Sequence, residues 1–287
     1  MNRPGDGKLA GVMGWPIGHS LSPALHAYWL RELKIDGAYV ALPVMRETFA
    51  SALRGLRDAG FAGVNVTVPH KESAYAIAHE LDEIARLSGA VNVLVFRGDR
   101  FIGRNTDVEG LVASLAETLG AKAVQGRPVV LLGSGGAARA AVLACDQLRA
   151  SAIRVVCRHP ARGEGLIAAL KGRVSADLSV TAWSDVAKAT NGAALLVNAT
   201  SAGMKGNAAL TLSLEALPAD AAVCDIVYNP LETELLQSAR LAGHCTVDGL
   251  GMLMHQAVPA FELFYGARPK VSAGLRRALE QALGHAG

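Results

Sequence analysis

The sequence predicts an α/β protein built from two domains. Its 287 residues exceed the length of one typical domain, about 100–200 residues. Short apolar runs alternate with amphipathic runs along the chain, and this pattern changes near residue 110. Hydrophobic residues make up 51% of the chain and charged residues 18%, which excludes the disordered and low-complexity classes.

The first part of the chain is expected to form a small α/β domain. Its apolar runs predict strands near residues 9–14, 38–43, 63–68, 91–96 and 100–104. Amphipathic runs predict helices near residues 22–34, 46–59 and 72–87. The segment Gly98-Asp99-Arg100 indicates a hairpin turn between the last two strands.

The second domain is expected to hold a doubly wound parallel sheet. From about residue 128, helical or polar stretches separate six β-rich runs: Pro128–Gly133, Ile153–Cys157, Val180–Trp183, Leu195–Asn198, Val223–Val227 and Thr246–Val247. This alternation is typical of parallel strands with crossover helices. Two further helices, Met252–Phe264 and Ser272–Leu283, are expected to pack back on the first domain. The predicted domains are therefore residues 1–110 with 250–287, and residues 111–249.

Charge and composition exclude several classes of partner. The net charge is +3 without a basic run, which argues against nucleic acid as the main partner. No apolar run reaches the roughly 18 residues that span a bilayer, and Met1 to Lys8 lacks the hydrophobic stretch of a signal peptide. We therefore expect a cytoplasmic protein without a membrane partner. Its cysteines and histidines show no CxxC, HExxH or zinc-finger spacing, so no metal is expected.

A glycine-rich turn follows the first buried strand of the second domain. The strand runs into Gly133-Ser134-Gly135-Gly136-Ala137, and a helix is expected over Ala138–Leu148. The order strand, G-x-G-x-x-A, helix is typical of a dinucleotide site, because the backbone approaches the pyrophosphate at the helix N-terminus. The alternative is a glycine-rich turn that serves packing alone.

The end of the next strand favours NADP over NAD. An NAD site has an acidic residue there that binds the ribose 2′-hydroxyl. Here the strand ends in Cys157-Arg158-His159, with Arg162 shortly after. Arg158 and Arg162 suit a 2′-phosphate, because guanidinium groups form charge-assisted hydrogen bonds with phosphate oxygens. The alternative is that both arginines are solvated surface residues.

Lys71 and Asp107 are the candidates for the chemistry. A nicotinamide enzyme that reduces a ketone needs a proton donor at the carbonyl oxygen, where negative charge develops. Lys71 follows a predicted strand and can serve as that donor. Asp107 lies where a strand gives way to a helix and can pair with Lys71. The alternatives are a surface charge for Lys71 and a helix N-cap for Asp107.

Further polar side chains surround these candidates in the sequence. Asn65, Thr67 and His70 lie beside Lys71, and Asn92 ends the segment Gly89-Ala90-Val91-Asn92. Ser20 and Ser22 offer two hydroxyls on a constrained loop, which suit a small carboxylate. The alternative is that these serines cap the helix expected to begin near Pro23.

These motifs together resemble the shikimate dehydrogenase family, NADP-dependent reductases of 3-dehydroshikimate in the shikimate pathway of aromatic amino-acid biosynthesis. The resemblance covers nearly the whole chain. Its motifs occur in order as GWPIGHSLSP (14–23), NVTVPHK (65–71), GAVN (89–92), NTD (105–107), GSGGAAR (133–139), NATSAGM (198–204), DIVYNPLETELL (225–236) and DGLGMLMHQA (248–257).

The resemblance implies a Rossmann-like cofactor domain and a role for each matching residue. Lys71 and Asp107 would form the catalytic pair and contact shikimate. The other substrate contacts would be Ser20, Ser22 and Tyr228 for the carboxylate, and Thr67, Asn92 and Gln256 for the ring hydroxyls. The NADP contacts would be Gly133, Ser134, Gly135, Gly136, Ala137, Arg158, Arg162, Thr200, Ile226, Gly249 and Met252, with Glu83 a weaker match.

Several readings stay open beside this one. A quinate/shikimate or aminoshikimate dehydrogenase would share these motifs, although many quinate enzymes have an acidic residue at the second strand end, which is absent here. A non-catalytic protein that binds NADP or shikimate is a further alternative, because a fold does not fix a function. Intact Lys71 and Asp107 argue against it. The family contains monomers and dimers, so a homodimer is left open.

Overall fold

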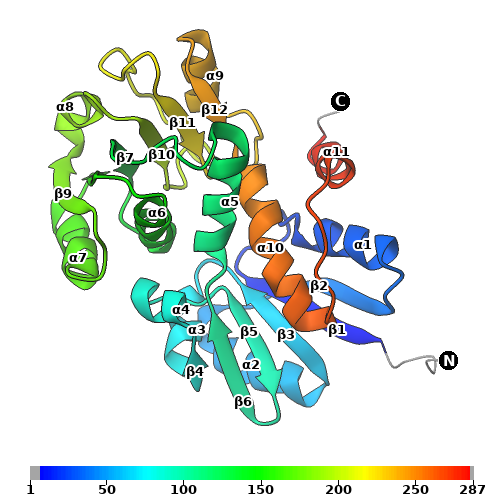
Figure 1. The fold of residues 1–287 in the computed structure, drawn as a ribbon. Helices are drawn as coiled ribbons and strands as arrows, with labels where there is room; N and C mark the ends of the chain where they lie inside the picture. Colours follow the sequence, from blue (N-terminus) through cyan, green and yellow to red (C-terminus); the bar gives the residue numbers. More distant parts are fainter. Residues whose placement is uncertain (1–6, 285–287) are drawn as a thin grey trace. The chain divides into compact units, whose positions relative to one another are not determined.

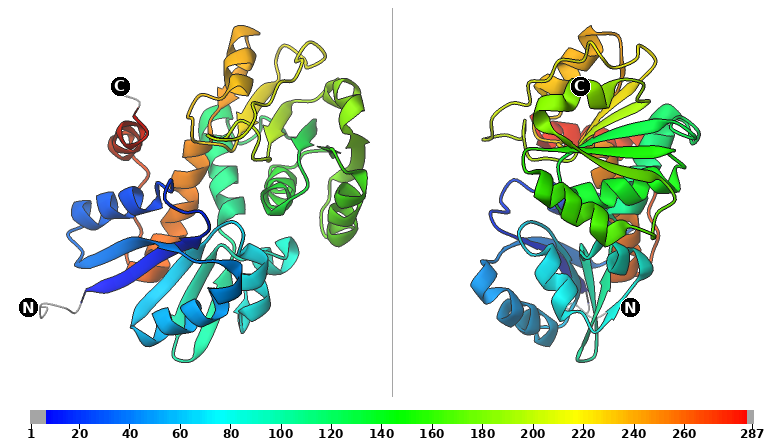
Figure 2. Two further views of the ribbon diagram at one scale, coloured as in Figure 1. Left: turned by 180° about the vertical axis from the view of Figure 1, so that it is seen from behind. Right: turned by 90° about the vertical axis from the view of Figure 1, so that its left-hand side faces the viewer.

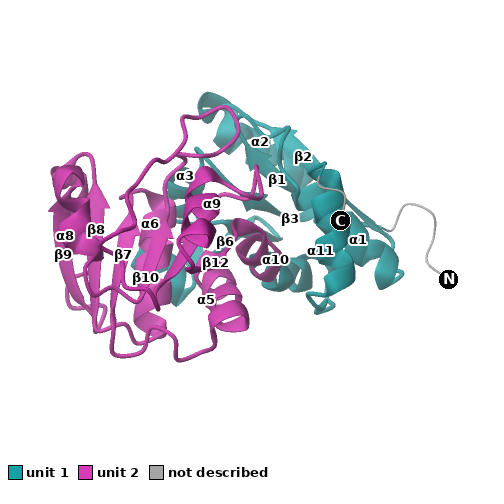
Figure 3. Cartoon of the chain, turned by 90° about the horizontal axis from the view of Figure 1, so that it is seen from above, with its two compact units in different colours: residues 1–106, 256–287 teal, residues 107–255 magenta. Residues whose placement is uncertain are grey.

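The computed structural model describes residues 7–284. Residues 1–6 and 285–287, which the prediction assigns to the first domain, lie outside the described residues. The chain divides into two compact units, Met1–Thr106 with Gln256–Gly287 (unit 1) and Asp107–His255 (unit 2), coloured teal and magenta in Figure 3. Each unit contains its own sheet.

Unit 1 is built on a mixed sheet in the order β2-β1-β3-β5-β6-β4 (Figure 1). Its strands are β1 (Lys8–Gly14), β2 (Gly37–Pro43), β3 (Phe61–Val66), β4 (Glu80–Leu81), β5 (Val93–Arg97) and β6 (Arg100–Arg104). β1 runs parallel to β2 and β3, whereas β5 is antiparallel to β3 and β6. The predicted hairpin at Gly98-Asp99 is confirmed: Arg97 pairs with Arg100, and Gly98 has φ +59°.

Helices cover both faces of this sheet. One face carries a short 3-10 turn, η1 (Arg46–Thr48), with α2 (Phe49–Asp58) and α3 (Lys71–Ile77), and buries Phe49 and Leu53 against Val64. The other face carries α1 (Ser22–Glu32), whose Trp29 and His26 pack with Phe261 of α10 (Gly249–Tyr265). α11 (Ala273–Ala282) packs on α1. The C-terminal helices therefore contact the first lobe, as predicted.

The predicted helix over residues 72–87 is wrong. The segment forms α3, then β4, then α4 (Glu83–Ser88). His79 leaves the helix because its backbone N–H donates to Phe101 O at 2.9 Å and its ring accepts from Phe101 N at 3.0 Å. Asp82 then caps α4 through a 2.7 Å hydrogen bond from Ala85 N. Pairing with a strand distant in sequence thus overrides the local helical pattern.

Unit 2 is built on a sheet of parallel strands in the order β12-β11-β10-β7-β8-β9. The strands are β7 (Pro128–Leu132), β8 (Ala152–Cys157), β9 (Asp177–Ala182), β10 (Leu195–Asn198), β11 (Ala222–Asp225) and β12 (Cys245–Val247). The chain runs outward from β7 to β9, then returns to β10 on the other side of β7. This reversal is the switch point of a doubly wound sheet, so the predicted fold class is confirmed.

Helices lie on both faces of the second sheet (Figure 2). They are α5 (Asp107–Leu119), α6 (Gly136–Gln147), α7 (Pro160–Leu170), η2 (Trp183–Asp185), α8 (Val186–Thr190), α9 (Glu234–Leu241) and the first part of α10. α8 and α9 bury Ala189, Leu235 and Leu236 against Val130 and Leu196 of the sheet. α10 begins three residues before the predicted helix at Met252, and β9 begins three residues before Val180. Within residues 7–284, no helix combines the length and apolarity that a bilayer crossing requires.

Candidate active site

The glycine-rich turn has the backbone geometry of a dinucleotide cradle. Gly133 follows β7 with φ +111°, and a Cβ there would lie 3.0 Å from the Ala199 carbonyl oxygen, so only glycine fits. Gly135 caps α6 without a side-chain hydrogen bond, and Gly136 begins the helix. The space that a Cβ would fill at Gly135 and Gly136 is open. A pyrophosphate can therefore approach the first N–H groups of α6.

Parallel strands bring the other predicted cofactor residues to the same sheet edge. The carboxyl ends of adjacent parallel strands meet there, and ligands bind at the switch point between β7 and β10. Arg158 follows β8, Thr200 lies two residues after β10, and Ile226 follows β11. Gly249 begins α10 directly against the Ile226 carbonyl group, where a side chain would clash. Ser134 and Ala137 lie in the turn itself, and Met252 lies in the first turn of α10.

The connection after β8 is basic and exposed. Arg158 follows Cys157 directly, and Arg162 lies in the first turn of α7, where its N–H donates to His159 O at 3.0 Å. Both arginines are exposed, and no carboxylate lies between residues 157 and 162. The donors at this strand end therefore fit a phosphate and not a ribose diol.

In unit 1, the ends of β1 and β3 hold two loops together. Trp15 N–H donates to Val68 O at 3.1 Å, and Thr67 N–H donates to Met13 O at 2.9 Å. A Cβ at Gly14 would lie 2.6 Å from Thr67 Cγ2, so the two loops approach as closely as glycine allows. The loop that carries Ser20 is thereby placed beside the segment that carries Thr67 and leads into Lys71.

Neither serine occupies the N-cap of α1. Leu21 is the N-cap residue and forms no side-chain capping bond. Ser20 Oγ accepts a hydrogen bond from Ser22 N–H at 3.3 Å, and Ser22 is buried at the start of the helix. Both hydroxyls thus lie at the N-terminal end of α1, where the helix dipole favours an anion.

Asn92 links the polar residues of unit 1. Its Nδ2 donates to Thr106 Oγ1 at 2.9 Å and to Gln256 Oε1 at 3.3 Å. Its backbone O accepts from Val66 N–H at 2.8 Å, and the preceding Val91 N–H donates to Lys71 O at 3.0 Å. The structure therefore brings Thr67, Lys71, Asn92 and Gln256 together at one end of the first sheet.

The remaining predicted residues lie at helix starts or after strands. Lys71 is the first residue of α3 and is half-buried in unit 1. Asp107 is the first residue of α5 in unit 2, is 6% exposed, and directly follows Thr106. Tyr228 follows β11 in unit 2 and is half-buried. Glu83 is the exposed first residue of α4 in unit 1.

Sequence reasoning gave no role to several polar residues that support these side chains. Tyr39 OH donates to Asn65 Oδ1 at 2.7 Å, and Asn65 Nδ2 donates to Asn92 O at 3.3 Å. In unit 2, Asn198 and Asp225 form a buried pair beneath Thr200. The quoted motifs contain Asn65, Asn198 and Asp225. A polar residue within a motif that has no assigned contact was therefore the sequence feature that could have identified them as supporting residues.

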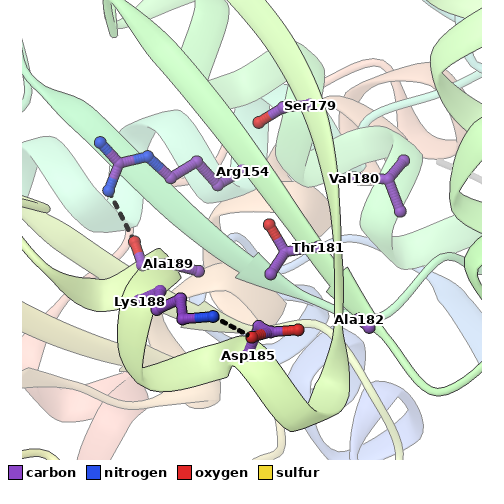
Figure 4. A pocket seen from close by; sticks show the side chains of 8 residues that line it. All are labelled: Arg154, Ser179, Val180, Thr181, Ala182, Asp185, Lys188 and Ala189. Atoms are coloured by element: carbon purple, nitrogen blue, oxygen red, sulfur yellow. Dashed lines mark hydrogen bonds and ion pairs between the residues drawn. The ribbon is translucent and has the colours of Figure 1, made fainter.

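A separate hollow of about 480 Å³ lies beside β8 and β9 (Figure 4). Arg154 donates there to Ala189 O and Asn191 O, both at 2.7 Å, and Lys188 pairs with Asp185 at 2.7 Å. Its lining residues are Arg154, Ser179, Val180, Thr181, Ala182, Asp185, Lys188 and Ala189, and no predicted site residue is among them. Through its two bonds, Arg154 of β8 links the end of α8 to the sheet.

A glycine cradle at the switch point of a parallel sheet, with arginines at the next strand end, defines a dinucleotide-dependent oxidoreductase of the NADP type. Comparison with known proteins specifies the family. The model of the shikimate dehydrogenase substrate binding domain matches residues 12–94. The shikimate dehydrogenase (NADP(+)) of Paramagnetospirillum magneticum is 47% identical over 273 residues, covering 95% of this chain and 98% of that protein.

Solved structures agree with this relationship. A shikimate dehydrogenase in complex with NADP+ superposes with a TM-score of 0.87 at 30% identity, covering 99% of this chain and 98% of that one. The Thermus thermophilus shikimate 5-dehydrogenase, in complex with NADP(H) and shikimate, gives 0.84 at 34% identity, covering 96% and 99%. The chain belongs to the NADP-dependent shikimate dehydrogenase family. The predicted family, enzyme class, pathway and NADP cofactor are thereby confirmed.

Proposed function

We propose that this chain reversibly reduces 3-dehydroshikimate to shikimate with NADPH, using Lys71 and Asp107 as its catalytic residues. The observation that supports the proposal is the hydrogen-bonded group around Asn92, which includes Gln256 and reaches the Lys71 backbone through Val91. The relatives named for this activity support the same reaction.

The glycine turn and the arginines after β8 would hold NADP. Gly133 allows the tight turn, Gly135 and Gly136 leave the backbone open to a pyrophosphate, and Arg158 and Arg162 supply donors for the 2′-phosphate. Ser134 and Ala137 complete the turn, and Thr200, Ile226, Gly249 and Met252 complete the proposed contacts along the sheet edge. When bound, NADPH supplies the hydride that the ketone carbon accepts.

The polar group of unit 1 would orient the substrate. Ser20 and Ser22 lie at the N-terminal end of α1, which favours the shikimate carboxylate, and Tyr228 is proposed to assist them. Thr67, Asn92 and Gln256 would contact the ring hydroxyls. Both ends of the Asn92 amide are hydrogen-bonded. Its Oδ1 accepts from Thr106 N–H at 2.8 Å, and its Nδ2 donates to Thr106 Oγ1 at 2.9 Å.

Lys71 would move the proton. During reduction its ammonium group donates a proton to the C3 oxygen as the ketone becomes a secondary alcohol. In the reverse direction the neutral amine takes the hydroxyl proton back. Asp107 would orient the Lys71 amine and accept a hydrogen bond from a neighbouring hydroxyl. A positioned acid or base of this kind contributes about 10²–10⁴-fold to a rate.

The test is the change in nicotinamide absorbance with purified protein. Shikimate, quinate and an amino analogue of shikimate are each offered with NADP and with NAD. Turnover of shikimate with NADP alone supports the proposal. Preference for quinate or for NAD would move the chain to the quinate/shikimate class, and turnover of an amino analogue alone would move it to the aminoshikimate class. Binding of shikimate without any turnover would contradict the catalytic roles of Lys71 and Asp107.

We further propose that the protein acts in the cytoplasm, as a monomer or homodimer, without nucleic acid, membrane or metal partners. Fractionation of cells and light scattering from the purified protein test the location and the oligomeric state.

A further inference from the structure

A buried polar chain beneath the ends of β10 and β11 has no part in the proposed reaction. Asp225, the last residue of β11, is 0% exposed. Its Oδ1 accepts hydrogen bonds from Asn198 Nδ2 at 2.9 Å and from Val227 N–H at 3.0 Å. Its Oδ2 accepts one from the Thr233 hydroxyl at 2.8 Å. All of these groups point their donors at the carboxylate, so Asp225 acts as an acceptor only.

Asp225 is one of two acceptors that set which way the Asn198 amide faces. Burial raises the pKa of Asp225 to about 6, so the carboxylate is mainly ionised near neutral pH and cannot donate. The NH₂ group of Asn198 therefore faces Asp225 and also donates to Ala202 O at 3.2 Å, and its Oδ1 faces Thr200. That oxygen accepts from Thr200 N–H at 3.0 Å and from the Thr200 hydroxyl at 2.7 Å.

The Asn198 amide in turn fixes the Thr200 side chain. The Thr200 hydroxyl donates to Asn198 and accepts from Ala202 N–H at 3.1 Å, so both of its hydrogen-bonding directions are set. Its methyl group then faces the glycine turn. A Cβ built on Gly133 would lie 3.0 Å from Thr200 Cγ2, which makes the methyl group a wall of that turn.

We propose that Asp225 is a positioning residue for the cofactor site: through Asn198 it holds Thr200 against the Gly133 turn, and through Val227 N–H it holds the backbone after Ile226. The carboxylate touches neither substrate nor cofactor in this role. The proposal rests on the proposed function, which assigns Gly133, Thr200 and Ile226 to NADP binding.

The test compares Asp225→Leu with Asp225→Asn. Leucine removes the acceptor from Asn198, Val227 and Thr233. Asparagine retains Oδ1 for Asn198 and Val227, and its amide group can face Thr233, whose hydroxyl then accepts. The dissociation constant of NADP is measured by titration calorimetry, without turnover. We expect about a tenfold or greater weakening for Asp225→Leu and less than about threefold for Asp225→Asn, because leucine takes the acceptor away from Asn198 and Val227 whereas asparagine keeps it.

The KM for shikimate, measured at saturating NADP, should stay close to that of the wild type in both variants. Equal NADP affinity in Asp225→Leu and the wild type would overturn the positioning role. An equal loss of NADP affinity in both variants would also overturn it, because Asp225→Asn keeps the acceptor that orients the Asn198 amide. Failure of the wild type to bind NADP would instead refute the proposed function, and this proposal with it.

A second pair of variants, at Thr233, tests the proposal if Asp225→Leu does not fold. Thr233 lies outside the proposed cofactor contacts but supplies the donor to Asp225 Oδ2. Thr233→Val removes that hydroxyl with little change of shape, and with it the acceptor for Leu236 N–H at the start of α9, whereas Thr233→Ser keeps both hydrogen bonds. Weaker NADP binding in the valine variant, restored in the serine variant, supports the proposal. Equal binding in both variants overturns it.

Discussion

Asn92 and Thr106 hold each other through two reciprocal hydrogen bonds. Asn92 Nδ2 donates to Thr106 Oγ1 at 2.9 Å, and Thr106 N–H donates back to Asn92 Oδ1 at 2.8 Å. Asn92 is 3% exposed and Thr106 is 5% exposed, so water competes little for either bond. Since Asp107 is the next residue, the same pair fixes the backbone from which this proposed catalytic carboxylate extends.

Replacement of Asn92 by Leu should raise the KM for shikimate and leave the dissociation constant of NADP unchanged. The variant loses the amide that binds Gln256 and Thr106, and buried partners left unpaired cost about 1–3 kcal/mol each. Steady-state kinetics at saturating NADP, with calorimetry for NADP alone, separate the two effects. Asn191→Ala, at an exposed position on unit 2, is the control. An Asn92 variant with wild-type KM would remove Asn92 from the substrate site.

Replacement of Lys71 by Met should lower kcat by about 10²–10⁴-fold with a smaller change in KM, because the proton donor is lost while the aliphatic stem is retained. Lys188→Met is the matched control, since the Lys188 side chain is 84% exposed and pairs with Asp185 in unit 2. Initial rates in both directions provide the measurement. A kcat close to that of the wild type in the Lys71 variant would show that another group moves the proton.

The predictions that succeeded rest on local patterns. The glycine turn needs a particular backbone at Gly133, and the Gly98-Asp99 hairpin needs a left-handed residue, so each is encoded in a few neighbouring residues. The split of residues 72–87 could not be predicted in this way. It depends on His79 pairing with Phe101, which lies 22 residues away, and on the Asp82 cap that restarts the helix.

The supporting residues of the site were missed for the same reason. Asn198 and Asp225 lie 27 residues apart, and only the parallel pairing of β10 with β11 brings them together. Tyr39 and Asn65 come from β2 and β3, which β1 separates in the sheet. Asn65, Asn198 and Asp225 fall within motifs as Lys71 and Asp107 do, but a motif does not reveal which of its residues act through another residue.

Replacement of both Arg158 and Arg162 by Ala should raise the KM for NADP and leave the KM for NAD nearly unchanged. Only NADP carries the 2′-phosphate, and each lost charge-assisted hydrogen bond costs about 1.5–3 kcal/mol, or roughly tenfold or more in affinity. Arg173→Ala, at another exposed position on unit 2, is the control. An equal rise for both cofactors would place the arginines at the pyrophosphate or outside the site.

We expect His26 to make the fold less stable in acid. This histidine is 1% exposed, stacks on Tyr39 with ring centroids 3.8 Å apart, and is surrounded by Trp29 and Phe261. Burial lowers its pKa from 6.5 to about 3. Between these two pKa values, His26 is protonated in the unfolded chain and neutral in the folded chain. Its titration therefore lowers the free energy of unfolding as the pH falls below about 6.5.

His26→Phe removes this titration and retains an aromatic ring in the cluster. Its stability relative to the wild type should improve on the order of 3 kcal/mol between about pH 7 and about pH 4, since one unit of pKa difference corresponds to about 1.36 kcal/mol. Urea unfolding of both proteins at the two pH values measures the change. His19→Phe, at an exposed histidine of unit 1, is the control. A wild type and His26→Phe variant that lose stability in parallel would show that His26 accepts a proton within the folded protein.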